Sequence, residues 1–539
     1  MTIFHSGPVR TSQPARNSGP ARNSRKVHWK RWLYLSHRWV GIVLCLLFAA
    51  WFVSGIVMMY VGFPNLDRDE RLPGLPTLNF SAARLSPAAA VARLHEGDFS
   101  TVGAPDGNSQ RAIADPTAPL AAPSAMRLGM LFDRPVYRVE VRGAQPRVVF
   151  ADNGEILRAV TPSMAQWAVD DFIQRREGKS VHARHIELRQ TDQWTLSGNL
   201  NAHRPLHRVA LDDAAGREFY VSTSTGEVVR DTARRERLLN YVGAVTHWIY
   251  PTVIRRHPAF WVWLVDIVAS AGVLLAISGL WIGVLRWKPR AGKSSVPYRG
   301  VMRWHYFTGI GFGLFTLTWV FSGLMSMNPG GLNAPRVPSA AEKAVTTGLT
   351  KALRASDFAQ LPPAFAEDTV EAELLHYDGR PFYLLTARDG ARQLLDARTG
   401  APARTDVGHL IALAPALLPN AAPPGIDLLQ DYDDYYYSRH PERGGKPLPA
   451  LRVRFADDNN TWFHIDVLSG QLIERSTTAN RAFRWLYNGL HSWDFYWLWQ
   501  HRPLWDIAVI AFSLGGLLLS VLGVVVGWRR LKRALSLGA

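Results

Sequence analysis

The chain has a single cysteine, Cys45, among its 539 residues. One thiol cannot build a disulfide framework, a multi-cysteine zinc site or an iron–sulfur cluster. The sequence also lacks a Cys-x-x-Cys-His motif, which excludes covalently attached c-type haem. Charged residues make up only 19% of the chain against 47% hydrophobic ones. The chain is therefore not a disordered polyelectrolyte.

Acidic side chains are scarce, 44 against 61 basic ones, and the formal net charge is +17. Such a charge would ordinarily suggest a nucleic-acid partner, so the position of the basic residues matters. Eighteen of them lie in three short segments that contain no acid, residues 1–38, 286–304 and 528–539, and the rest of the chain is almost neutral. Clusters of Lys and Arg beside apolar spans mark the cytoplasmic side of a membrane. The charge therefore predicts membrane topology and no nucleic-acid partner.

Four apolar runs are each long enough for the roughly 20 helical residues that cross a bilayer. They predict transmembrane spans at residues 39–63, 259–285, 305–328 and 504–528. The basic segments then place both termini, residues 1–38 and 529–539, and the loop 286–304 in the cytoplasm. The remaining segments are two outer domains, 64–240 and 329–480, each followed by an interfacial helix, 241–258 and 481–503.

The chain contains an internal repeat. The first and third spans match at an offset of 268 residues, and the second and fourth match at an offset of 244. The matched residues are His37 and His305, Gly41 and Gly309, Trp51 and Trp319, Ser54 and Ser322, Gly55 and Gly323, His247 and His491, His257 and His501, Gly279 and Gly523, and Gly283 and Gly527. Two parallel copies of this kind are expected to pack about a pseudo-two-fold axis along the membrane normal. Equivalent residues then face each other across that axis.

Four segments of the outer regions read as β-hairpins, an apolar strand, a turn that contains glycine and a second strand. They are residues 149–156, 219–228, 394–400 and 463–472. Helical stretches lie between them. The predicted fold is a membrane protein with four transmembrane helices in two parallel repeats and two periplasmic α+β domains.

His37 and His305 lie at the cytoplasmic start of the first and third spans. A glycine follows each of them at i+4, and Gly55 and Gly323 return to the same helix face five turns further on. Two imidazoles that face each other above cleared helix faces can supply both axial ligands of a b-type haem. Arg38 and Arg303 stand beside them in the sequence and can pair with its propionates.

His247 and His491 form a second matched pair, set in aromatic segments that lead into the second and fourth spans. They predict a second bis-histidine haem near the outer surface. His257 and His501 are matched as well and serve as the fallback outer ligands. For all these histidines the alternative is structural packing of polar side chains at the membrane interface.

Two other features of the spans have simpler interpretations. Asp266 and Asp506 would be costly deep in lipid, which favours a proton or cofactor role, although both fall in the outer half where water can reach them. The matched Gly-x-x-x-Gly pairs of the second and fourth spans are typical of closely packed helices, and packing alone explains them.

The paired His-x-x-x-Gly span starts, the Gly489-Leu-His491 element, the strand-Thr-Gly-Glu hairpins and the segment RWLYNGLHSWDFYW resemble the PepSY-associated transmembrane proteins. The resemblance covers almost everything after residue 30. Some bacterial inner-membrane members of that family are ferric-siderophore reductases with two b haems and periplasmic PepSY domains. The resemblance thus implies haem iron ligation at His37, His305, His247 and His491.

The sequence departs from the family pattern at one place, where Tyr306-Phe-Thr follows the second-copy histidine in place of Arg-Trp-Val. The propionate argument relies there on Arg303 alone. Some relatives carry fused flavin and nicotinamide domains, which this chain does not. Its electrons are therefore expected from a separate cytoplasmic or quinol donor.

The leading hypothesis is an inner-membrane oxidoreductase with two b haems that passes electrons to a periplasmic acceptor, iron(III) in a siderophore. One alternative is a PepSY-domain membrane anchor that binds or regulates a periplasmic peptide, protease or partner without redox chemistry. A transporter is a third interpretation, against which stand the small number of spans and the lack of a charged pathway.

Overall fold

The computed structural model describes residues 24–96, 123–141, 144–288, 296–331, 333, 335–347, 368–377, 380–439 and 445–536. Three parts of the predicted cytoplasmic segments, residues 1–23, 289–295 and 537–539, lie outside this set.

Four of the described helices are long and apolar enough to cross a membrane. They are α1 (Ser24–Met58), α7 (Pro258–Arg286), α8 (Val301–Met325) and α14 (Leu504–Ser536). Each contains most of one predicted span. Helix α1 begins before residue 39 and α14 continues past residue 528, because the flanking Lys, Arg and Leu residues are good helix formers. The chain is thus a membrane protein built on four apolar helices.

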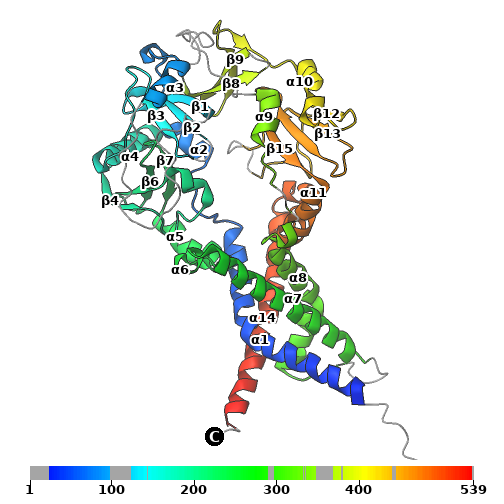
Figure 1. Ribbon diagram of the computed structural model, residues 1–539. Helices are drawn as coiled ribbons and strands as arrows, with labels where there is room; N and C mark the ends of the chain where they lie inside the picture. The colour runs from blue at the N-terminus through cyan, green and yellow to red at the C-terminus, as the bar shows by residue number, and fades with distance from the viewer. Residues whose placement is uncertain are drawn as a thin grey trace, which may run out of the picture.

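The four helices form a bundle in which α1 and α8 each pack against both α7 and α14 (Figure 1). Glycines allow the closest contacts. A Cβ atom at Gly272 would lie 2.8 Å from Val320, and one at Gly516 would lie 2.2 Å from the Phe52 ring. Carbon atoms prefer separations of about 3.5–4.0 Å, so side chains at these positions would push the helices apart.

The strands of the outer regions form three antiparallel sheets. The strands of the first half are β1 (Pro123–Leu131), β2 (Arg134–Val141), β3 (Arg147–Phe150), β4 (Ala183–Arg189), β5 (Leu206–Leu211), β6 (Glu218–Ser222) and β7 (Val228–Thr232). Those of the second half are β8 (Thr369–Tyr377), β9 (Arg380–Ala387), β10 (Arg392–Asp396), β11 (Pro402–Ala403), β12 (Gly425–Leu429), β13 (Ala450–Arg454), β14 (Trp462–Asp466) and β15 (Leu472–Ser476). All four predicted hairpins form.

A helix precedes each run of strands, so the outer regions are of the α+β type. The four helices are α3 (Pro87–Glu96), α4 (Pro162–Glu177), α9 (Ala340–Thr347) and α10 (Val407–Leu413). Turn glycines adopt the left-handed backbone that their hairpins require, with φ of 69° at Gly226 and 68° at Gly470. The sequence therefore produces four helix-plus-meander units, two in each half.

The largest sheet is shared by the two halves. Its strand order is β11-β10-β9-β8-β1-β2-β3, and β1 pairs with β8 so that Arg127 lies opposite Glu373 and Leu128 opposite Ala372. The lobes of the two halves lie apart above the bundle and meet at this sheet (Figure 1). The sequence predicted separate outer domains at residues 64–240 and 329–480. It did not reveal that the two share a sheet.

One hydrophobic core also spans both halves. Met126 and Leu128 of β1 are buried in the same cluster as Leu374 of β8 and Leu385 of β9. Burial of apolar surface stabilises by about 25 cal/mol per Å². The pairing of β1 with β8 is therefore supported by side-chain packing as well as by its backbone hydrogen bonds.

Short helical pieces connect the outer sheets to the bundle, where the sequence predicted interfacial helices 241–258 and 481–503. The first connection contains α5 (Arg234–Asn240), the π-helical turn η4 (Tyr241–Val245) and α6 (Thr252–Arg255). The second contains α11 (Thr478–Arg484), the π-helical turn η9 (Trp485–Gly489), α12 (Leu490–Ser492) and α13 (Tyr496–Gln500). Each connection is thus helical in pieces and carries one π turn.

Candidate functional site

The outer pair of predicted histidines is in contact. His247 follows η4 and His491 lies in α12, directly after η9. Their ring centroids are 5.9 Å apart and the ring planes are inclined at 73°. Single π-helical turns often occur at functional sites because they re-aim the side chains beside them. The structure brings these two residues together from positions 244 residues apart.

Each outer histidine hydrogen-bonds to a buried serine of the bundle. His247 Nδ1 lies 3.0 Å from Ser54 Oγ, and His491 Nδ1 lies 3.0 Å from Ser322 Oγ. Each serine hydroxyl donates its one hydrogen to a carbonyl in its own helix, that of Trp51 or Trp319. The backbone of Trp51 and Trp319 also faces the two rings, so we assign each imidazole the tautomer with hydrogen on Nδ1, in which the serine oxygen accepts. This tautomer leaves the Nε2 lone pair of both rings available for a metal.

The outer pair fits an axial-ligand role by distance and surroundings. Two imidazole nitrogens bound to one metal ion at about 2 Å place their ring centres about 6 Å apart. Trp51 and Trp319 have their backbone beside this pair, and their indole nitrogens are buried without a hydrogen-bond partner within the described chain. Such unpaired buried donors are suited to a polar group of a bound molecule.

The inner pair of predicted histidines, His37 and His305, lines one cavity of about 580 Å³ within the bundle. Residues of α1, α7, α8 and α14 all contribute to its wall. Cofactor and ligand pockets have volumes of about 300–1,000 Å³. The cavity is therefore large enough for a cofactor, and both histidines border it.

Glycines form much of the wall of this inner cavity, and they are Gly41, Gly279, Gly283, Gly309, Gly313, Gly523 and Gly527. A Cβ at Gly279 would lie 2.8 Å from His37 Cε1, and one at Gly523 would lie 3.6 Å from His305 Cε1. The first glycine of each Gly-x-x-x-Gly pair thus makes room for an inner histidine, whereas the second, Gly283 or Gly527, meets an isoleucine of a neighbouring helix. Gly55 and Gly323, predicted beneath the inner histidines, instead adjoin His247 and His491.

The two inner histidines differ in their polar contacts. His37 Nδ1 lies 3.2 Å from the carbonyl of Leu275 and 3.1 Å from Ser278 Oγ. His305 Nδ1 is buried and forms no hydrogen bond of normal geometry in the part of the chain that the structure describes, although the Leu519 backbone is beside it. At the repeat offset of 244, Leu522 stands where the other half has Ser278. The inner site is therefore asymmetric where the outer site is symmetric.

The structure places only one of the two predicted arginines at the inner cavity. Arg38 lines the inner cavity, but Arg303 is not among its lining residues and lies over the Phe307 ring at 5.6 Å. Arg31, Arg286 and Arg530 line the cavity instead. Arg286 and Arg530 are separated by the repeat offset of 244, so the repeat in the sequence already relates them.

The fallback histidines, His257 and His501, are exposed at the starts of α7 and α14. His501 Nδ1 contacts the carbonyl of Trp497, four residues earlier. Asp506 accepts hydrogen bonds from Tyr60 and from Arg502, at 3.0 and 2.8 Å, so an ion pair explains this buried acid. One carboxylate oxygen of Asp266 is buried without a partner in the described residues.

No group of three or more His, Cys, Asp and Glu side chains in the described residues is arranged to hold a metal ion. A bis-histidine haem needs only two protein ligands, because the macrocycle supplies the others. The two histidine pairs are consistent with that requirement.

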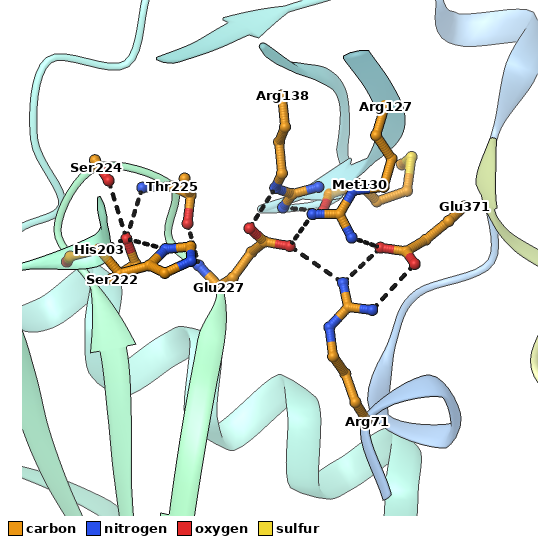
Figure 2. A network of polar contacts seen from close by, with 10 residues as sticks. All are labelled: Arg71, Arg127, Met130, Arg138, His203, Ser222, Ser224, Thr225, Glu227 and Glu371. Carbon is orange, nitrogen blue, oxygen red and sulfur yellow. Dashed lines mark hydrogen bonds and ion pairs between the residues drawn. The ribbon is translucent and has the colours of Figure 1, made fainter. Parts of the chain in front are cut away.

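A charged network that the sequence did not reveal lies in the outer regions (Figure 2). Glu227, in the turn after β6, accepts from Arg127 at 2.7 Å and from Arg71 of α2 (Arg68–Arg71) at 3.1 Å, and lies 3.4 Å from Arg138. Glu371 of β8 contacts the same Arg71, at 2.5 Å, and Arg127. The network therefore joins the first half of the chain to the second, next to the shared β1–β8 pair.

The network is charged although it is mostly buried. The side chains of Glu227 and Glu371 are 9% and 12% exposed. Burial opposes ionisation, but Arg127 and Arg71 outweigh it and lower the pKa of Glu371 to about 2. The pKa of Glu227 also lies well below its usual value, since Arg127 and Arg138 outweigh its burial. Both carboxylates are ionised at neutral pH.

The fold and the site define a membrane protein of four apolar helices, with histidine pairs near both ends of the bundle and α+β units outside it. The chain belongs to the PepSY-associated TM region family, whose sequence model matches residues 35–530. No curated protein matches the chain.

Proposed function

We propose that the protein is a transmembrane electron carrier with two b haems. The observation that carries the proposal is the outer pair, whose rings lie 5.9 Å apart with both Nδ1 atoms on buried serines. Bound haem supplies one-electron oxidation and reduction of iron. The role of this chain is to hold the two haems at different depths of one helix bundle.

The residues of the inner cavity are suited to the same kind of group. His37 and His305 would be the axial ligands, and the glycine wall would accept the flat ring. Arg38, Arg286 and Arg530 border the cavity and would pair with its two propionates, since arginine binds carboxylates in a bidentate fashion. In this assignment Arg286 and Arg530 replace Arg303.

The direction of electron transfer follows from the proposed topology. The basic segments support a cytoplasmic location of both termini in a bacterial inner membrane and a periplasmic location of the outer regions. His37 and His305 would then serve a cytoplasmic or quinol donor, and His247 and His491 a periplasmic acceptor. The family resemblance supports iron(III) in a siderophore as that acceptor. One electron converts it to iron(II), which hard oxygen ligands hold far less tightly.

A visible spectrum of the purified protein tests the proposal. The reduced-minus-oxidised difference is expected to show b-type bands, with about two haems per chain because the structure holds two histidine pairs. The measurement is made on full-length protein in detergent, with haem counted by the pyridine haemochrome method. Protein that is folded and yet free of haem would contradict the proposal and favour the alternative of a PepSY-domain anchor without redox chemistry.

A glycine variant tests the inner cavity. The Gly279→Ala substitution is expected to weaken the inner haem and leave the outer one, because the new methyl group would lie 2.8 Å from His37 Cε1 and displace the ring. The haem content after detergent washing measures this. Gly311→Ala is the matched control, since a Cβ there meets nothing within 4 Å. Equal haem content in the two variants would argue against a haem beside Gly279.

A further inference from the structure

The serine contacts of the histidines follow a pattern that haem ligation alone does not require. Ser54 and Ser322 are fully buried, at 0% exposure, and each lies 3.0 Å from an imidazole Nδ1. The hydroxyl hydrogen of each is used within its own helix, and in the assigned Nδ1–H tautomer each serine acts on the imidazole as an acceptor. The outer site therefore has two equivalent Nδ1–H···Oγ hydrogen bonds.

A hydrogen bond of this kind changes the ligand as well as its orientation. An acceptor on Nδ1–H fixes the tautomer, orients the ring and raises the basicity of Nε2. A more basic ligand stabilises iron(III) relative to iron(II), and second-shell hydrogen bonds are one of the means by which a protein tunes haem potential. Two such bonds would favour the oxidised state of the outer haem and make the reduced haem a stronger reductant.

The inner site offers an internal comparison. His37 has a serine acceptor, Ser278, whereas His305 has none because Leu522 occupies the equivalent position. The number of serine acceptors is therefore two at the outer pair and one at the inner pair. The Leu275 carbonyl beside His37 does not distinguish the sites, because the other three imidazoles face the backbone of Trp51, Trp319 and Leu519.

We propose that Ser54 and Ser322 are positioning residues that lower the midpoint potential of the outer haem through the Nδ1 atoms of His247 and His491, and that Ser278 acts in the same way on the inner haem through His37 alone. This inference rests on the proposed function. It assigns a role to three serines of the apolar helices. Without this role, their presence in these helices would be explained by helix packing alone.

Potentiometric titration of full-length protein, followed at the haem bands, tests this. The Ser54→Ala and Ser322→Ala substitutions are each expected to raise the outer potential, and the double variant more than either. A tenfold shift in the iron(III)/iron(II) equilibrium would appear as 59 mV for a one-electron couple. The Ser54→Thr variant keeps the hydroxyl and is expected to restore the potential. Ser326→Ala is the control, because among the described residues Ser326 Oγ bonds only to the backbone of Gly323.

The swap variant Leu522→Ser tests the inner site independently. It gives His305 the acceptor that His37 already has, and the inner potential is expected to fall. If the alanine double variant keeps two haems and its outer potential is unchanged, the proposal is overturned while the haem assignment stands. If the alanine variants lose the outer haem, an unchanged inner potential in Leu522→Ser overturns it. Wild-type protein without haem would instead refute the proposed function.

Discussion

Full-length protein with the His37→Ala substitution is expected to lose the inner haem and to keep the outer one, so that its haem content falls to about half. The reason is geometric. His37 and His305 border one cavity. His247 and His491 contact each other, and they adjoin Gly55 and Gly323, which do not line that cavity. The two sites share no histidine. Removal of one ligand therefore affects one site.

The reciprocal variant completes this test. His491→Ala is expected to remove the outer haem and spare the inner one, and the two variants should differ in which component of the redox titration remains. His257→Ala and His501→Ala are matched controls, since both side chains are exposed near the same connections. Haem content is measured per mole of folded protein. Loss of a haem in either control, or of both haems in His37→Ala with the fold intact, would contradict the assignment.

The ligand candidates could be found from the sequence because the repeat is exact in spacing. His247 and His491 lie 244 residues apart, and Ser54 and Ser322 lie 268 apart, so each half supplies one histidine and one serine to the outer site. The four apolar helices could be predicted for a similar reason, since a bilayer requires about 20 apolar residues. Both signals are local patterns that need no knowledge of the fold.

The shared sheet could not be predicted in this way. Each strand of an antiparallel hairpin identifies its neighbour through the turn between them, but β1 and β8 are far apart in the chain and no turn joins them. The charges of Arg127 and Glu371 follow no local pattern either. Arginine and glutamate are mostly exposed in folded proteins, so their burial in a network appears only in the structure.

Arg303 shows that a residue close to a histidine in the sequence need not face the same site. It stands two residues before His305, which suggested that it would face the same group. Residues two apart on a helix point in different directions, whereas residues three or four apart share a face. Two of the arginines that do line the cavity, Arg286 and Arg530, come from the C-terminal parts of the neighbouring helices α7 and α14.

The Glu371→Ala substitution in the outer network is expected to lower the free energy of unfolding of the outer regions by about 3–5 kcal/mol, the usual cost of removing one partner from a buried ion pair. Arg71 and Arg127 would each lose a carboxylate that they contact, and Glu227 alone could not neutralise three arginines. The control is Glu155→Ala, since the Glu155 side chain is 57% exposed in its pair with Arg134. Exposed pairs contribute about 0–1 kcal/mol.

Urea unfolding of the full-length protein in detergent, followed by tryptophan fluorescence, measures the difference between Glu371→Ala and Glu155→Ala. The pH dependence provides a second measurement. The pKa of Glu371 is about 2 in the folded protein against 4.5 for the free side chain, so its contribution is complete above pH 4.5 and is lost as the pH falls through about 2. Wild type is therefore expected to lose its advantage over Glu371→Ala in acid. Equal urea midpoints for the two variants at pH 7 would show that the β1–β8 pair and its apolar core hold the halves together without the network.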